Sequence, residues 1–276
     1  QKRLEKLSKH KEELEKVAGA NILLTEDNEI NQQVATELLA VEGFNVEVAE
    51  NGKVALDKVL QAEPGYYDVV LMDLQMPVMD GYQATEEIRK SFDKESLPIL
   101  AMTADVMAGV KERCFELGMQ DFVMKPIEPD ELFGALVRWI PPDKTKGRRP
   151  KTKISNKDKE KRVKEILIPD FELIDVDGAL KRVGGNKALF LKLITKFRDS
   201  GNSHYEDIIQ EIETGDREVA VRLAHTLKGV AGNLGIDGVF EAAKVVEAML
   251  KDSGTRVLGY SGTQEFEELK NAVDAV

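Results

Sequence analysis

The sequence has little cysteine, no long apolar run and no excess of positive charge. It contains 1 cysteine in 276 residues, so no disulfide can form within the chain, and this fits a reducing compartment. No apolar run approaches the roughly 20 residues of a spanning helix, and the charged N-terminus is unlike a secretory signal. A net charge of −11 disfavours binding to nucleic acid. We therefore expect a cytoplasmic location, with no nucleic-acid partner and no membrane contact within this chain.

The chain is 42% hydrophobic and 32% charged, which is typical of globular proteins. Its length of 276 residues predicts two domains. The chain starts without Met inside a predicted helix, so we expect a fragment of a longer polypeptide. Residues 1–18 place leucines at heptad-like spacing, with Lys11 interrupting the pattern. This helix is either the end of an upstream dimer helix or a solvated connector.

Short apolar segments alternate with amphipathic helices between residues 20 and 140. The expected strands are Asn21–Thr25, Asn45–Val48, Asp68–Met72, Pro98–Met102 and Asp121–Met124. The expected helices are Ile30–Val41, Gly52–Gln61, Gly81–Lys90, Val106–Leu117 and Pro129–Trp139. This alternation predicts a parallel sheet covered by helices on both faces, with right-handed crossovers.

Polar side chains stand at the carboxyl ends of the expected strands, where ligands bind in such folds. They are Glu26, Asp27, Asp73, Thr103 and Lys125. Two carboxylates about 4 Å apart repel by about 4 kcal/mol at an effective dielectric near 20, so the acids need a cation. Oxygen ligands suit Mg²⁺, and the lysine suits a phosphoryl oxygen. The pattern indicates phosphoryl transfer to Asp73, although Glu26-Asp27-Asn28 could instead cap the following helix.

The second half of the chain is helical and follows a basic segment. Residues 141–165 carry 11 Lys or Arg and 4 Asp or Glu, which predicts a solvated linker at 141–168. A nucleic-acid role for this segment is a weaker alternative. The expected helices further on are Val176–Val183, Lys187–Ser200, Ser203–Glu213, Arg217–Leu234, Gly238–Leu250 and Thr263–Ala275. Their spacing suits an antiparallel bundle.

One helical stripe of this half carries a histidine, a lysine and two glycines. His225, Lys228, Gly229 and Gly232 lie at i, i+3, i+4 and i+7. A mid-helix glycine costs about 1 kcal/mol relative to alanine, so the glycines need a reason. They either let another protein approach the histidine or allow close helix packing within the bundle.

The first half resembles two-component response-regulator receiver domains in four blocks: Leu24-Thr25-Glu26-Asp27-Asn28, Met72-Asp73-Leu-Gln-Met-Pro77-Val-Met-Asp80-Gly81, Met102-Thr103-Ala104 and Lys125-Pro126-Ile127. The resemblance implies a flavodoxin-like α/β fold with a five-stranded parallel sheet of order 2-1-3-4-5. It implies phosphorylation of Asp73, with Thr103 and Lys125 contacting the phosphoryl group and a cis peptide before Pro126. It also implies Mg²⁺ ligands, which are Asp27, Asp73, Glu26 through a water and the backbone carbonyl of Gln75.

The second half resembles the histidine-containing phosphotransfer (HPt) domain. The block Ala224-His225-Thr-Leu-Lys228-Gly229-Val-Ala-Gly232-Asn233-Leu-Gly235 carries the resemblance, together with residues 183–197. It implies an all-α four-helix bundle in which an exposed His225 carries the phosphoryl group and Lys228 steadies it.

A receiver domain followed by an HPt domain resembles the C-terminal part of a hybrid sensor histidine kinase. We expect an N-terminal helix or linker at 1–19, the receiver at 20–140, the linker at 141–168 and the HPt bundle at 169–276. The sequence has no glycine-rich ATP-binding region, so the chain should transfer phosphoryl groups without using ATP itself. The implied parent is a sensor histidine kinase, with an inner-membrane anchor as one option.

The expected function is a phosphorelay, and two other functions remain as alternatives. The expected partners are a histidine kinase domain, upstream or in trans, and a downstream response-regulator receiver. The first alternative is a regulatory binding module in which phosphorylated Asp73 controls docking and His225 is idle. The second is a flavodoxin-like cofactor binder, which the acidic crevice and the lack of a glycine-rich phosphate loop disfavour.

Overall fold

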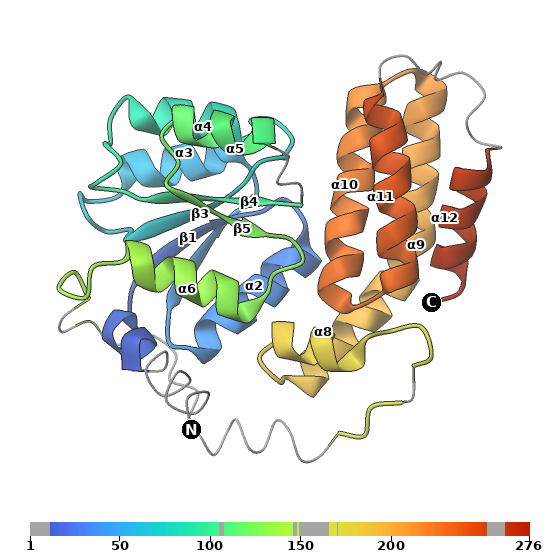
Figure 1. Ribbon diagram of the computed structural model, residues 1–276, viewed down its shortest axis with the longest axis horizontal. Coiled ribbons are helices and arrows are strands. Elements are labelled where there is room, and N and C mark those ends of the chain that lie inside the picture. Colours follow the sequence, from blue (N-terminus) through green and yellow to red (C-terminus); the bar gives the residue numbers. More distant parts are fainter. Residues whose placement is uncertain (1–11, 105–107, 146–147, 149–165, 170, 253–262) are drawn as a thin grey trace. The chain divides into compact units, whose positions relative to one another are not determined.

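The computed structural model describes residues 12–104, 108–145, 148, 166–169, 171–252 and 263–276 (Figure 1). The chain divides into two compact units, at residues 1–159 and 160–276. Most of residues 1–18, much of the basic segment and the loop before the last helix lie outside the described residues. Among the described helices, none combines the length and apolar character needed to cross a membrane.

A parallel five-stranded sheet forms the centre of the first unit, in the order β2-β1-β3-β4-β5. This confirms the expected flavodoxin-like order. The strands are β1 Asn21–Thr25, β2 Asn45–Ala49, β3 Val69–Asp73, β4 Ile99–Thr103 and β5 Asp121–Met124. The third and fourth strands run one residue further along the chain than expected, so each polar site residue there is the last residue of its strand.

Helices cover both faces of this sheet, as the near-continuous apolar strands require (Figure 1). The helices are α2 Glu29–Val41, α3 Gly52–Gln61, α4 Gly81–Arg89, α5 Ala108–Glu116 and α6 Pro129–Trp139. One core lies between the sheet and α2 with α6, and a second lies between the sheet and α3, α4 and α5. Successive residues of β1 alternate between these cores: Leu23 faces the second, whereas Ile22 and Leu24 face the first.

Described residues before β1 and after α6 also pack on the first unit. Helical residues 12–17 place Leu14 and Val17 in the α2–α6 core, so these two side chains are not solvated. After α6, the Thr145 hydroxyl donates to the Lys16 carbonyl at 2.8 Å. Arg148 forms an ion pair with the buried Asp68. The start of the basic segment therefore contacts the first unit directly.

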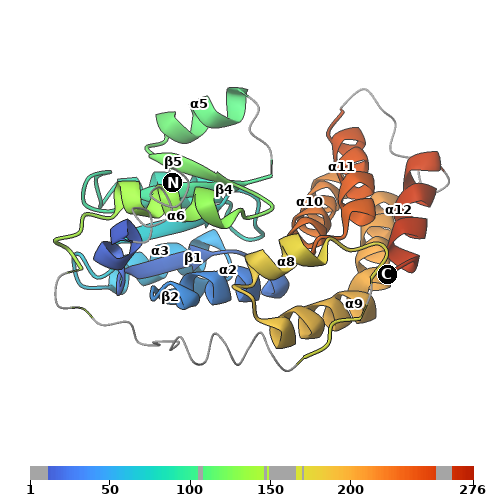
Figure 2. The same ribbon diagram turned by 60° about the horizontal axis from the view of Figure 1, so that its bottom comes forward.

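The second unit is a helical bundle (Figure 2). Its helices are α8 Val176–Arg182, α9 Lys187–Thr214, α10 Arg217–Leu234, α11 Asp237–Lys251 and α12 Gln264–Asp274. Among the described residues, α9, α10, α11 and α12 pack around one another as a four-helix bundle, and α8 lies against α9 and α10. The prediction of two helices within α9 was wrong. Buried Phe197 and Ile208 lie on either side of Gly201 and hold the helix continuous, since one glycine costs only about 1 kcal/mol.

Candidate functional site

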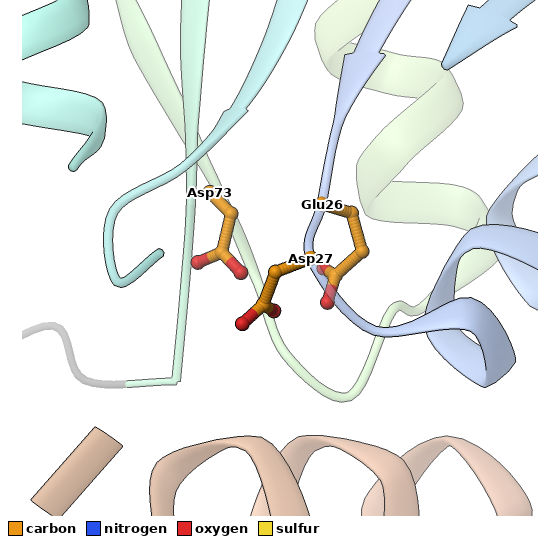
Figure 3. Close-up of side chains that lie close together, drawn as sticks. All are labelled: Glu26, Asp27 and Asp73. Carbon is orange, nitrogen blue, oxygen red and sulfur yellow. The ribbon is translucent and has the colours of Figure 1, made fainter. Parts of the chain in front are cut away.

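Three carboxylates meet at the carboxyl end of the sheet in the first unit (Figure 3). Glu26 and Asp27 follow β1, and Asp73 is the last residue of β3. One oxygen of each side chain lies within 4.8 Å of the others. The parallel strands bring them together because β1 and β3 are neighbours in the sheet. Side chains separated by almost 50 residues in sequence thus share one crevice.

Lys125 lies among these acids. Its ammonium is 2.6 Å from Glu26 Oε2 and 2.7 Å from Asp73 Oδ2, and its side chain is 2% exposed. It follows β5, and the peptide between it and Pro126 is cis, as the resemblance implied. Of Glu26-Asp27-Asn28, which could cap the next helix, it is the third residue that does so. Asn28 caps α2 through its side chain, which accepts from two backbone N–H groups.

The electrostatics of the crevice favour added positive charge. Burial raises the pKa of Asp73; Lys125 opposes this rise, and the charges of Glu26 and Asp27 add to it. For Lys125, burial alone would lower the pKa, but the negative charges of Asp73 and Glu26 raise it overall. Burial and the neighbouring carboxylates thus favour the protonated form of Asp73, and the carboxylates favour the charged form of Lys125. Protons or metal cations are therefore attracted to this position.

The other predicted receiver residues lie at the same edge of the sheet. Thr103 ends β4 and is 5% exposed. The backbone N–H of Gln75 donates to Asp73 Oδ1 at 3.2 Å, which holds the loop after β3 against the carboxylate. A side chain on Gly81 would bring its Cβ within 2.1 Å of the Asp73 carbonyl oxygen, so only glycine allows α4 to start this close. Gly81 belongs to the receiver motif, but the sequence alone does not show that it approaches the Asp73 carbonyl so closely.

The same loop contains a strained residue at its tip. Val78 has φ +70°, and the N–H of Met79 donates to the Pro77 carbonyl at 2.8 Å, which forms a γ-turn. A β-branched residue with positive φ is an outlier, and the Val78 side chain is 82% exposed. Nothing in the sequence pattern predicted this turn.

The second unit builds its site from α10 and α11. His225 Nδ1 lies 2.9 Å from Glu247 Oε1, and the Lys228 ammonium contacts Glu247 Oε2. Lys251, one helical turn beyond Glu247, donates to Oε1 at 2.7 Å. The side chain of His225 is 4% exposed, which differs from the exposed histidine that the resemblance implied, and its Nδ1 edge faces Glu247. Sequence reasoning missed Glu247 and Lys251, although a lone acid inside the apolar run Val245–Leu250 was a usable signal.

Glu247 is the electrostatic centre of this site. Burial would raise the pKa of its carboxyl, but the hydrogen bond from His225 and the charge of Lys228 hold the pKa well below its usual range. An ionised carboxylate only accepts hydrogen bonds, so Nδ1 of His225 carries the ring proton. The lone pair of the neutral imidazole then belongs to Nε2, which is the nitrogen suited to nucleophilic attack.

Comparisons with known proteins identify both units. Residues 22–137 match the response regulator receiver domain, and residues 192–276 match the Hpt domain. The chain is therefore a response regulator receiver domain followed by an Hpt domain, as the sequence resemblances implied. The sheet order confirms the fold class, and the receiver match disfavours a flavodoxin-like cofactor binder.

The relatives are histidine kinases. The chain is 28% identical over 235 residues to the signal transduction histidine-protein kinase BarA of Escherichia coli K12, covering 85% of this chain and 24% of that protein. It is 42% identical over 144 residues to probable histidine kinase 4 of rice, covering 45% of this chain and 14% of the relative. The chain thus spans a quarter or less of these relatives. The solved receiver domain of a Pseudomonas aeruginosa sensor histidine kinase is 40% identical, covering 44% of this chain and 98% of that domain, with a TM-score of 0.40.

Proposed function

We propose that Asp73 is the phosphoryl acceptor of the receiver domain and that His225 is the phosphoryl carrier of the HPt domain. The observation that supports Asp73 most strongly is its position between Lys125 and two further carboxylates at the carboxyl end of the sheet. In the forward step a carboxylate oxygen of Asp73 attacks the phosphorus of a phosphohistidine. The new O–P bond forms as the N–P bond breaks, and the donor histidine leaves as a neutral imidazole.

The surrounding side chains act by position and charge, as expected for phosphoryl transfer. The Lys125 ammonium already touches Asp73 and can follow an oxygen of the incoming group. The Thr103 hydroxyl, at the end of the neighbouring strand, donates to a second oxygen. The roles of both residues are proposals that rest on this placement and on the family assignment.

We also propose Mg²⁺ as the metal of the receiver domain. Its protein ligands would be Asp27, Asp73, Glu26 through a water, and the backbone carbonyl of Gln75. The donor set fits, because it offers only oxygens, three of them within 4.8 Å, and carries an excess of negative charge. Bound there, the cation would offset the charge of the phosphoryl group. Asp27→Asn should weaken Mg²⁺ binding at least tenfold in titration calorimetry, whereas the exposed Asp57→Asn should not; equal affinities in both would contradict the assignment.

In the HPt domain, Nε2 of His225 would form the bond to phosphorus, and Lys228 would steady the phosphoryl oxygens. The receiver would comprise residues 20–140 and the HPt domain residues 169–276, joined by the basic segment. The proposed partners are a histidine kinase domain, upstream or in trans, and a downstream receiver. Since a kinase partner needs ATP, we propose that the relay operates in the cytoplasm, and that the parent polypeptide is a sensor histidine kinase.

Phosphoryl transfer with mass mapping tests the order of these steps. Asp73→Asn should abolish labelling of His225 by the kinase while leaving labelling by a downstream phospho-receiver intact. Label that still reaches His225 from the kinase in Asp73→Asn would contradict the order. Acid-labile label, typical of phosphohistidine, is expected on the chain with His225 intact. Its absence would favour the regulatory binding module in which His225 is idle.

A further inference from the structure

Glu247 of the HPt domain carries more cationic contacts than one carboxylate needs. Its Oε2 accepts from Lys228, and its Oε1 accepts from both His225 Nδ1 and Lys251 Nζ, at 2.9 Å and 2.7 Å. The Glu247 side chain is 3% exposed, whereas that of Lys251 is 38% exposed. One buried acid is therefore shared by two lysines, one on its own helix and one on α10.

This sharing creates a conflict for the proposed function, on which the inference rests. Lys228 donates to Glu247, and turning its ammonium toward a phosphoryl group on Nε2 of His225 would weaken that contact. If Lys228 simply left, a buried carboxylate would lose a cation, and an uncompensated buried charge is strongly unfavourable. The site thus needs a second cation on Glu247 at the moment when Lys228 turns away.

Phosphorylation of His225 also requires that Glu247 stays ionised and in place. When the Nε2 lone pair bonds to phosphorus, the Nδ1 proton stays in place and the ring becomes cationic. Glu247 stabilises that ring only if it remains ionised and correctly oriented, since it fixes the proton on Nδ1. A cation that held Glu247 without touching the phosphoryl group would satisfy both needs.

We propose that Lys251 is this cation: a positioning residue that keeps Glu247 paired and thereby releases Lys228 to the phosphoryl group. Lys251 contacts Glu247 and not Lys228, so in this proposal its effect on the phosphoryl group passes through the release of Lys228 from Glu247. The effect of removing Lys251 should therefore depend on whether Lys228 is present, and this dependence separates the proposal from a general electrostatic attraction of anions.

The test measures labelling of His225 by phosphoramidate, a small P–N donor, in the full chain carrying Asp73→Asn. The Nε2–P bond forms as the P–N bond of phosphoramidate breaks, and ammonia leaves. The variants are Lys251→Gln, Lys228→Gln and the double variant. The matched control is Lys244→Gln, which removes an α11 lysine that pairs with the exposed Glu241 and not with Glu247.

Lys251→Gln should slow labelling about tenfold, the size of a typical coupling between neighbouring residues, and Lys244→Gln should not slow it. In the Lys228→Gln background, adding Lys251→Gln should produce no further loss. An unchanged rate in Lys251→Gln, or the same tenfold loss with and without Lys228, would overturn the proposal. If instead His225→Gln is labelled as well as the parent chain, the proposed carrier role fails, which is a different result.

Discussion

Replacing Lys125 with methionine tests the charge balance of the receiver crevice. The substitution keeps a long apolar stem but removes the ammonium that lies 2.6 Å from Glu26 and 2.7 Å from Asp73. At an effective dielectric near 20, each contact is worth about 6 kcal/mol of attraction, most of which the desolvation of the buried charges offsets. Breaking such a buried pair costs about 3–5 kcal/mol, because the carboxylates are left uncompensated. We expect a loss of about 4 kcal/mol in the free energy of unfolding at pH 8.

The loss should depend on pH in a defined direction. Burial already raises the folded-state pKa of Asp73, and removing Lys125 removes the charge that opposes the rise. A carboxyl whose folded pKa is raised stabilises the fold when protonated, and this contribution is lost as the pH rises through the folded pKa. The difference between Lys125→Met and the parent should therefore grow by about 1.4 kcal/mol for each pH unit above about 8, the folded pKa of Asp73 in the parent, until the carboxyl of the variant also ionises, and it should be constant below that pKa. Mg²⁺ should stabilise the variant more than the parent, since it supplies the missing charge.

Urea unfolding followed by fluorescence provides the assay. The chain has 1 tryptophan, Trp139 on α6, so the signal reports the receiver domain. Lys53→Met is the control, because its pair with Asp57 is exposed and should contribute less than about 1 kcal/mol. A loss of the same size at pH 7 and pH 9, with no added response to Mg²⁺, would refute the reasoning.

Three further substitutions test local features of the receiver by urea unfolding. Val78→Gly should raise stability by about 1 kcal/mol, because glycine relieves positive-φ strain of about 1–3 kcal/mol at a smaller entropic cost; a loss would contradict the strain. Gly81→Ala should cost about 3 kcal/mol through the clash with the Asp73 carbonyl, and a neutral result would show that the loop can move. Arg148→Gln should cost about 2 kcal/mol, because Asp68, whose pKa burial already raises, loses its cation. That loss should be smaller at pH 5 than at pH 8, and no loss at either pH would refute it.

The centre of the sheet was predictable because β1, β3 and β4 are short, apolar and almost fully buried. β3 and β4 are buried at every position, so a continuous apolar run followed by one polar residue located each of them. The order of the strands could not be predicted from this pattern. Alternation of strands and helices predicts a parallel sheet, but only the motif resemblance indicated that β1 lies between β2 and β3.

Errors arose where distant packing outweighs a local signal. Two helices were expected at 187–200 and 203–213, yet buried residues before and after the gap carry α9 through. Leu14 was expected in a heptad-like pattern, and it packs instead, with Val17, into the core beneath α6. In each case the local pattern fixed the presence of a helix, whereas the surface that the helix meets decided its length and its role.

The two candidate sites also differ in how far the sequence predicts them. The receiver residues follow strand ends, so topology alone gathers them at one edge. Glu247 lies 22 residues from His225 on another helix, and no spacing rule within one element connects them. Its contact depends on the packing of α10 against α11, which only the folded structure supplies.

The two sites have opposite charge balances, and this bears on the role of a metal. In the receiver crevice three carboxylates face Lys125, so the site is anionic before any phosphoryl group arrives. Around His225, Glu247 faces Lys228 and Lys251, so the site is cationic before phosphorylation. A phosphoryl dianion is therefore repelled at Asp73 unless a further cation is bound there, whereas the histidine site supplies its own countercharge. On this argument a divalent cation belongs to the chemistry of the carboxylate, and its removal should halt transfer to Asp73 without emptying His225.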